Sequence, residues 1–444
     1  MRNILRLYLA CLGIVWLLGW PTDLVAGPTG APNVVLIISD DQGWGDFGFM
    51  GHPHIQTPHI DRLARESLVY RHGYVPSSLC CPSLAVVLTG KYPHQTKITG
   101  NEPPRPQGVK QSYRDPGFLA QVKELNGFMA QHARLPHELG QAGYVSFQTG
   151  KWWAGNYQTG GFTHGMSHGD QSRGGRHGDE GLEIGRKSLE PIYKFIKEAA
   201  DKPFLVWYAP MLPHQPHNPP DRLLQKYMRQ NPSPHIAKYW AMCEWFDETC
   251  GELLGHLEEQ GLAKNTIVVF MIDNGWIQDP DRAAYRSDSK QSQYDGGLRT
   301  PIMIRWPEHV APRMVDTPVS SIDIAPTLYR ACGRDVPAGL PGIDLLDEKA
   351  VANRDAIFGA CFLHNAVDIH APEKNVTYRW CVSGEWKLIL PNLVNVKQPN
   401  KPGRDIGPEL YRIKMDPTEE NNLVKTHPDQ VERLTKLIDG WWKL

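Results

Sequence analysis

Short apolar runs alternate with amphipathic segments along the first three quarters of the chain. Segments 57–68 and 236–260 place apolar residues three and four positions apart, which predicts helices. Four other runs are almost wholly apolar, as is typical of strands buried on both faces of a parallel sheet. The alternation therefore predicts an α/β fold, with a large mixed sheet flanked by helices. The four apolar runs lie at residues 34–39, 144–147, 204–209 and 266–272.

The pattern changes near residue 350. Two apolar runs at residues 378–382 and 386–390 are followed by a single amphipathic segment that begins at about residue 428. This arrangement predicts a smaller antiparallel sheet-and-helix domain. We therefore expect a catalytic α/β domain over residues 27–350 and a small C-terminal domain over residues 351–444.

The first residues have the pattern of an export signal. Arg2 and Arg6 precede an apolar run at residues 7–20, and Ala26 offers a small side chain at a cleavage point. A membrane span needs roughly 20 apolar residues, so the run is short for that role. An uncleaved anchor is the alternative. We expect residues 1–26 to be a signal peptide and the mature protein to be secreted or periplasmic, without stable membrane insertion.

Composition and charge limit the classes of partner. Hydrophobic residues make up 41% of the chain and charged residues 21%, as in ordinary folded proteins. The formal net charge of -1 argues against a nucleic-acid binder that works through a broad basic field. An anionic substrate would therefore need positive side chains gathered at one site.

Chemically useful side chains follow each of the four predicted strands. Acids and glycines also end strands for purely structural reasons, which is the alternative for any one of them. Four such ends predict a single site, because ligands bind beyond the carboxyl ends of strands in open α/β sheets. The residues that follow the strands are Asp40, Asp41, Lys151, His214, Asp273 and Asn274.

Four of these residues offer only oxygen ligands. Asp40 and Asp41 are adjacent, and Asp273 and Asn274 follow a different strand. Adjacent carboxylates repel each other unless a cation lies between them. Carboxylate and amide oxygens suit a hard cation such as Ca²⁺ or Mg²⁺ better than Zn²⁺. We expect one divalent cation, Ca²⁺ before Mg²⁺.

The segment from Ser77 to Gly90 places a cysteine at the start of a predicted helix. Pro82 favours the first turn and Gly90 the end of that helix, so Cys80 is expected just before its N-terminus. The partial positive charge there favours an anion. Composition alone favours the alternative that Cys80 and Cys81 are a buried structural pair.

The other cysteines do not form an obvious disulfide framework. Cys243 and Cys250 lie seven residues apart on a predicted helix, about 10.5 Å apart, which is too far for a disulfide. Cys361 with Cys381 is the one pairing that we consider.

The run C-x-P-S-x-x-x-x-L-T-G from Cys80 to Gly90 resembles the signature of the formylglycine-dependent sulfatases, of the alkaline phosphatase superfamily. Further segments resemble that family in the same order along nearly the whole mature chain. They are residues 40–46, 149–152, 213–214, 273–275, 290–301, 408–411 and 416–417.

The resemblance implies a fold, a cofactor and roles for individual residues. The fold would be alkaline-phosphatase-like, and a maturation enzyme would oxidise Cys80 to formylglycine, the nucleophile. The modified Cys80 would join Asp40, Asp41, Asp273 and Asn274 at the metal. Lys151, His214 and Lys290 would hold the sulfate oxygens and assist the leaving group, a charge arrangement that sulfate ester cleavage requires.

Two positions depart from the family pattern. Leu84 stands where the signature has arginine, and Trp153 stands where a histidine follows the lysine. Plain apolar packing is the alternative explanation of both residues. The Gly- and His-rich segment 155–186, a predicted loop, could supply what is missing, or it could only contact substrate or be a solvated insertion. Its candidates are His164, His168, Arg173, Arg176 and His177.

The sequence thus predicts a sulfuric ester hydrolase acting on a sulfated carbohydrate or an aryl or alkyl sulfate. One alternative is a phosphomonoesterase or phosphodiesterase on the same fold, which would usually carry ligands for a second metal. The other is a non-catalytic binder of sulfated glycans, suggested by the two departures. The modification state of Cys80 and the hydrolysis of simple esters would separate the three.

Overall fold

The computed structural model describes residues 30–231 and 233–444, so the predicted signal peptide lies outside the described residues. A large sheet of nine strands forms its centre, in the order β4-β3-β5-β1-β6-β7-β2-β8, with β9 paired to β2. The strands are β1 (Asn33–Ser39), β2 (Leu68–Tyr74), β3 (Val145–Gly150), β4 (His164–Gly165), β5 (Phe204–Ala209), β6 (Thr266–Ile272), β7 (Arg299–Arg305), β8 (Arg313–Val315) and β9 (Val319–Ser320).

The four predicted apolar runs are four adjacent strands. Strands β3 and β5, β5 and β1, and β1 and β6 pair in parallel, whereas β7 runs antiparallel to both β6 and β2. The carboxyl ends of β3, β5, β1 and β6 therefore meet at one edge of the sheet. The predicted fold class is confirmed.

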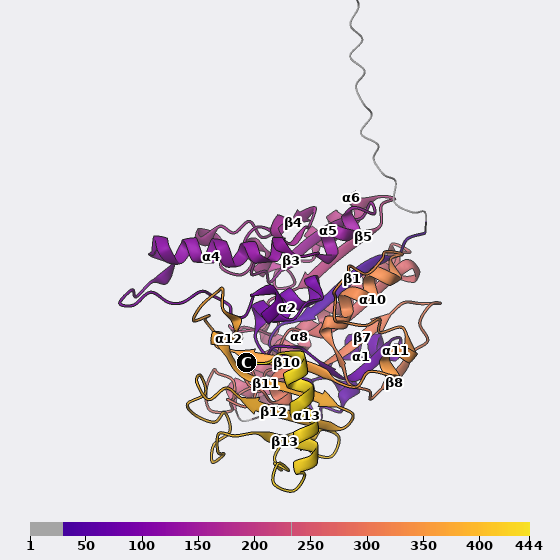
Figure 1. Ribbon diagram of the computed structural model, residues 1–444. Coiled ribbons are helices and arrows are strands. Elements are labelled where there is room, and N and C mark those ends of the chain that lie inside the picture. The colour runs from indigo at the N-terminus through magenta and orange to yellow at the C-terminus, as the bar shows by residue number, and fades with distance from the viewer. Residues whose placement is uncertain (1–29, 232) are drawn as a thin grey trace, which may run out of the picture.

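Helices cover both faces of this sheet (Figure 1). Alternate residues of β1 contact two different layers: Val34, Leu36 and Ile38 share a core with α2, α4, α5 and α10, and Val35 and Ile37 share one with α1, α6 and α8. This period of two is expected for a strand buried on both faces. The helices are α1 (Pro58–Arg65), α2 (Cys80–Thr89), α3 (Pro93–Thr96), α4 (Pro116–Phe128), α5 (Leu135–Gly140), α6 (Glu190–Ala199), α7 (Asp221–Met228), α8 (Pro234–Glu259), α9 (Asp295–Leu298), α10 (Ile324–Ala331), α11 (Glu348–Ala352), α12 (Pro372–Asn375) and α13 (Pro428–Trp441).

A second, four-stranded antiparallel sheet lies at the lower end of the molecule in Figure 1. It consists of β10 (Ile357–Phe362), β11 (Val376–Ser383), β12 (Trp386–Pro391) and β13 (Glu409–Arg412). Strands β11 and β12 are the two predicted runs, and α13 is the predicted last helix. Leu434 and Ile438 of α13 pack on Cys381, Leu388 and Leu410 of this sheet.

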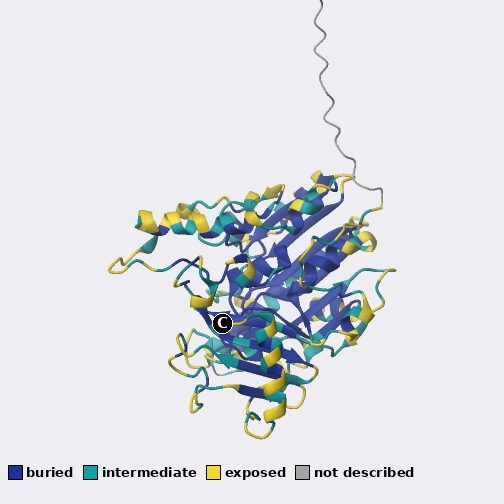
Figure 2. Cartoon of the chain, viewed as in Figure 1, coloured by how far each residue is buried: buried dark blue, intermediate teal, exposed yellow. Residues whose placement is uncertain are grey.

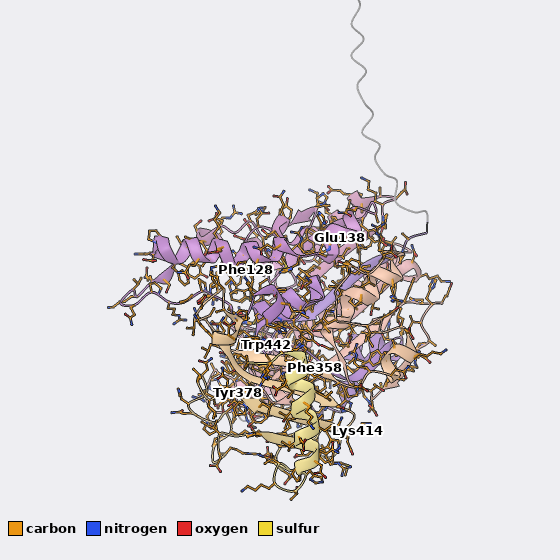
Figure 3. All side chains as sticks on the ribbon, in the orientation of Figure 1. Phe128, Glu138, Phe358, Tyr378, Lys414 and Trp442 are labelled. Carbon is orange, nitrogen blue, oxygen red and sulfur yellow. The ribbon has the colours of Figure 1, made fainter. Side chains whose placement is uncertain are left out.

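The two sheets are closely joined. Lys387 of β12 is fully buried and pairs with Asp295 at 2.8 Å and Glu419 at 2.7 Å. Figure 3 labels Phe358 of β10 and Trp442, which follows α13. The Phe358 ring stacks on Trp441 with 5.4 Å between centroids, and the Trp442 ring stacks on His94 with 4.4 Å. Figure 2 shows buried strands in both sheets and exposed residues on the outer sides of the helices. The boundary predicted between residues 350 and 351 falls within α11, and the division into two domains stays a prediction.

Two details differ from the sequence-based expectations. Cys361 and Cys381 are both free and buried, so the pairing that we considered is wrong. In the β10–β11 ladder Cys361 faces Tyr378 and Cys381 faces Phe358, so the two cysteines are three residues out of register. The predicted loop at residues 155–186 contains the short edge strand β4 and three 3₁₀ turns. No described helix is both long enough and apolar enough to cross a membrane.

Candidate functional site

The acidic residues that follow β1 and β6 meet at the N-terminus of α2. Asp40, Asp41, Cys80 and Asp273 are all buried, and one potential ligand atom from each lies within 4.8 Å of the others. The backbone holds the strand ends together, since Asp40 N–H donates to Leu212 O and Asp273 N–H donates to Ser39 O. Asp41 has a φ of 60°, a left-handed conformation that is costly for a residue other than glycine. The structure thus brings together chain segments that lie far apart in the sequence.

The oxygen atoms of this cluster fit a hard cation. Within the described part of the chain, Asp40 Oδ2, Asp273 Oδ2 and Asn274 Oδ1 are buried acceptors without a hydrogen-bond partner. Leaving such groups unsatisfied is costly, and three acceptors in one place are a natural ligand set for Ca²⁺ or Mg²⁺. Burial raises the pKa of Asp273, and the neighbouring carboxylate of Asp40 adds to the rise. A cation would oppose both effects.

Two ammonium groups face the carboxylates. Lys151 Nζ lies 2.6 Å from Asp40 Oδ1 and 3.3 Å from Cys80 Sγ. Lys290 Nζ donates to both carboxylate oxygens of Asp41, at 2.6 and 2.7 Å. Burial opposes the charged form of each lysine, but the nearby carboxylates outweigh it and raise the pKa of both. The two side chains therefore remain cationic at neutral pH and can bind an oxyanion.

His214 completes the set of side chains predicted for the sulfate. Its Nε2 lies 3.2 Å from Asp41 Oδ2, and its Nδ1 donates to Gln215 O at 2.5 Å. Burial lowers the pKa of His214, although the carboxylates of Asp40 and Asp41 act in the opposite direction. The sequence did not reveal Arg186, whose guanidinium donates to His214 O at 2.8 Å. That contact joins residues far apart in the chain, and no local pattern announces it.

Cys80 itself is a poor nucleophile in this setting. It is the first residue of α2, one position later relative to the helix than expected, and its thiol is buried. Burial raises the pKa of the Cys80 thiol to about 12, even though Lys151 and Lys290 act to lower it. The thiolate is the reactive form of cysteine, so the unmodified side chain would be almost inert at neutral pH.

The two departures from the family pattern lie side by side. Leu84 is 4% exposed and Trp153 8% exposed, and both line one small apolar cavity together with Cys81. Of the five loop candidates, two contact Trp153: the Arg176 guanidinium lies 4.9 Å from its ring and the His177 ring 5.4 Å from it, between centroids. The other three contact different residues: His164 meets Phe195, His168 meets Tyr157 and Arg173 pairs with Glu180.

Fold and site together define an α/β protein with a buried centre suited to a divalent cation and an oxyanion. The sulfatase family model matches residues 32–333, and the model of the C-terminal region of N-sulphoglucosamine sulphohydrolase matches residues 285–439. The chain therefore belongs to the sulfatase family, whose members are sulfuric ester hydrolases.

Similar proteins include sulfatases from mammals and bacteria. N-acetylgalactosamine-6-sulfatase of Rattus norvegicus is 28% identical over 373 residues, covering 73% of this chain and 66% of the relative. The chain thus spans about two thirds of the length of that relative. N-acetylgalactosamine-6-O-sulfatase of Bacteroides thetaiotaomicron is 24% identical, with 99% of each chain covered. The crystal structure of Ps i-CgsB in complex with k-i-k-neocarrahexaose has a TM-score of 0.73 at 23% identity, covers 93% of each chain and supports the fold.

Proposed function

We propose that this protein hydrolyses a sulfate ester of a carbohydrate and releases inorganic sulfate. The observation that carries the proposal is the buried cluster around Cys80, in which three carboxylates, an amide oxygen and two lysine ammonium groups converge. Charge neutralisation on the sulfate oxygens is the main requirement of sulfate ester cleavage, and preorganised cations supply it.

Asp40, Asp41, Asp273 and Asn274, with the side chain at position 80, would hold one divalent cation, Ca²⁺ before Mg²⁺. The cation would supply Lewis-acid stabilisation of negative charge, and a formylglycine at position 80 would supply a nucleophilic hydroxyl. The unpartnered oxygens of Asp40, Asp273 and Asn274 support the first assignment. The high pKa of the Cys80 thiol supports the second, because it leaves the unmodified residue unreactive.

Lys151 and Lys290 would bind the sulfate oxygens, since both ammonium groups lie at the cluster and stay charged. His214 would donate a proton to the departing alcohol. The donor would be Nε2 of the protonated imidazole, because Nδ1 already donates to Gln215 O, and the Asp41 carboxylate 3.2 Å from Nε2 favours that protonated form.

The names of the relatives indicate the class of substrate. Both N-acetylgalactosamine sulfatases act, by name, on a sulfated hexosamine. We therefore propose a sulfated carbohydrate rather than a simple aryl or alkyl sulfate. Secretion or export to the periplasm, and maturation by a formylglycine-generating enzyme, belong to the same proposal.

One observation favours a second candidate, a non-catalytic binder of sulfated glycans. Leu84 and Trp153 replace the two residues that steady the formylglycine in the family pattern, and both are buried in apolar surroundings. A two-metal phosphoesterase fits less well, because the described residues contain one cluster of potential metal ligands.

The test combines mass spectrometry with hydrolysis. Protein from a host that contains the maturation machinery should carry an aldehyde or its hydrate at Cys80 and not at Cys81. It should release sulfate from 6-sulfated N-acetylgalactosamine faster than phosphate from the matching phosphate ester. Cys80→Ser should abolish turnover, and the control Cys81→Ser should retain it.

Each other outcome excludes the proposal in a different way. An unmodified Cys80 in fully active protein contradicts the nucleophile. Faster hydrolysis of the phosphate ester points to a phosphoesterase. Binding of a sulfated oligosaccharide without turnover of either ester, by protein modified at Cys80, identifies a binder.

A further inference from the structure

Leu84 and Trp153 stand where the family pattern has an arginine and a histidine, and the structure shows which residues surround them. Leu84 and Trp153 line the same apolar cavity beside Cys81, and that cavity encloses about 20 Å³. There is room for little more than one water molecule, and the lining is apolar apart from Asn126, so no charged side chain lines it. The residues that could replace the missing arginine and histidine are therefore those that contact Trp153 outside this cavity.

An arginine makes one of those contacts. The Arg176 guanidinium lies 4.9 Å from the centroid of the Trp153 ring, a cation–π distance. Its Nε donates to Glu102 Oε1, and Glu102 is only 5% exposed. Tyr113 and Asn365 also donate to the Glu102 carboxylate, at 3.3 and 3.0 Å. These contacts hold Arg176 over the indole ring, although its side chain is still 35% exposed.

A histidine makes the other contact. The ring centroids of His177 and Trp153 are 5.4 Å apart, so an imidazole lies within about one ring width of the side chain that replaced the family histidine. The His177 carbonyl accepts from Trp152 N–H at 2.9 Å, which places it next to the end of β3 and Lys151. Its Nδ1 is buried and has no hydrogen-bond partner in the described chain.

Burial and nearby positive charges keep His177 neutral. Burial, followed by the positive charges of Lys151, Arg176 and His214, lowers the pKa of His177 to about 3. Lys151 and His214 are two of the side chains proposed to bind the sulfate, and the hydrogen bond from Trp152 N–H to His177 O joins His177 to the residue that follows Lys151. An anion bound among these groups would offset their charge and make the imidazole more basic.

The loop that carries both residues is held firmly. The Asp179 carboxylate accepts from the backbone N–H groups of His168, Gly169 and Asp170, at 2.7, 2.8 and 2.9 Å. Ser167 Oγ donates to Gly178 O at 2.8 Å. This scaffold orders the segment on either side of Arg176 and His177, as a precise role at the centre would require.

We propose that Arg176 and His177, seated on Trp153, serve the sulfate centre in place of the arginine and histidine that the family has at positions 84 and 153. Arg176 provides positive charge for the sulfate oxygens. His177 Nδ1 accepts a proton from a hydroxyl at the centre: the O–H bond breaks, an N–H bond forms, the electron pair stays on oxygen and the proton later passes to water. The inference rests on the proposed sulfatase activity.

The two residues should give different signatures. Arg176→Ala should weaken the binding of inorganic sulfate, measured by calorimetry, about tenfold or more, because a charged hydrogen bond is lost. His177→Ala should leave sulfate affinity unchanged but lower kcat by about a hundredfold or more, as for a lost proton acceptor, with KM little changed. Added imidazole should restore part of the activity of His177→Ala. Arg173→Ala and His168→Ala, which alter the same residue types on the same loop, are the matched controls.

A transplanted histidine tests the idea directly. Trp153→His combined with His177→Ala should have a higher kcat than His177→Ala alone, because it returns an imidazole to the family position, while sulfate binding weakens as Arg176 loses the indole ring. If Arg176→Ala and His177→Ala bind sulfate and turn over like the two controls, the inference is wrong. If His177→Ala loses activity but neither imidazole nor Trp153→His restores any, its role is structural and the inference is again wrong. If the unaltered protein has no sulfatase activity, that result instead contradicts the proposed function.

Discussion

Removal of the cation should destabilise the protein, and most of that loss should depend on Asp273. In the described structure, Asp40 Oδ2, Asp273 Oδ2 and Asn274 Oδ1 are buried without partners, and the carboxylates that carry the first two are at most 2% exposed. A chelator would leave these oxygens unsatisfied and the carboxylates facing each other. Asp273→Asn removes one buried charge from that arrangement.

The size of the effect follows from two separate arguments. Three unsatisfied acceptors at about 1–3 kcal/mol each correspond to about 3–9 kcal/mol. By mass action, a cation present at a thousand times its Kd stabilises the folded state by about 4 kcal/mol. Unfolding a chain of roughly 400 residues carries an entropy of about 0.85 kcal/mol/K, so 4 kcal/mol corresponds to a Tm shift of about 5 °C.

The assay is thermal unfolding with and without chelator, followed by re-addition of Ca²⁺, Mg²⁺ or Zn²⁺. The unaltered protein should lose about 5 °C and recover it with Ca²⁺ or Mg²⁺, whereas Asp273→Asn should show little change. Asp247→Asn is the matched control, because Asp247 is equally buried but is satisfied by the backbone N–H groups of His59 and Ile60. Its shift on chelation should equal that of the unaltered protein. An equal shift in Asp273→Asn, or recovery with Zn²⁺ alone, would refute the reasoning.

Two further predictions concern charge. Alanine at Lys151, His214 or Lys290 should lower kcat/KM, measured by steady-state kinetics, by roughly a hundredfold or more. Lys187→Ala is the control, because Lys187 is exposed, and it should leave kcat/KM unchanged. Near-normal values for any two of the three site variants would contradict the assignment of the site. Burial raises the pKa of Asp46 to about 6, so the folded state holds a proton there that the unfolded state has lost. That contribution, about 2–3 kcal/mol, is complete below about pH 4 and disappears as the pH rises to about 6. Asp46→Asn should remove this fall in stability from Tm measurements across that range, and an unchanged profile would contradict the shift.

The central strands could be predicted because burial on both faces of the sheet favours runs of apolar residues. Strands β1, β5 and β6 are flanked by helices on both faces, so nearly every residue in them is apolar, whereas β3 mixes apolar residues with Ser146, Gln148 and Thr149. Strand β2 carries Arg71 and His72, and β7 begins and ends with arginines, so neither forms an uninterrupted apolar run. Both are interior strands, since β7 lies between β6 and β2 and β2 lies between β7 and β8, so their polar residues, and not an edge position, hid them from a search for apolar runs.

Some residues of the candidate site could likewise be predicted from the sequence, and others could not. Residues that directly follow a buried strand, such as Asp40 and Asp273, could be predicted as site residues from their position at the end of that strand. Lys290 follows no such strand and was identified only through the family resemblance. Glu102 lies in a loop and pairs with Arg176, 74 residues later, so only the folded chain reveals it.

The two departures from the family pattern make physical sense only as a joint change. An arginine at position 84 alone would place a guanidinium in an apolar cavity of about 20 Å³, at a cost of several kcal/mol without a partner. A histidine at position 153 alone would remove the indole that supports Arg176 and His177. Leu84→Arg is therefore costly because of the cavity, and Trp153→His because Arg176 and His177 lose the ring they contact. Leu84→Arg should lower Tm in the presence of Trp153, and Trp153→His should release Arg176, so neither alone should improve turnover.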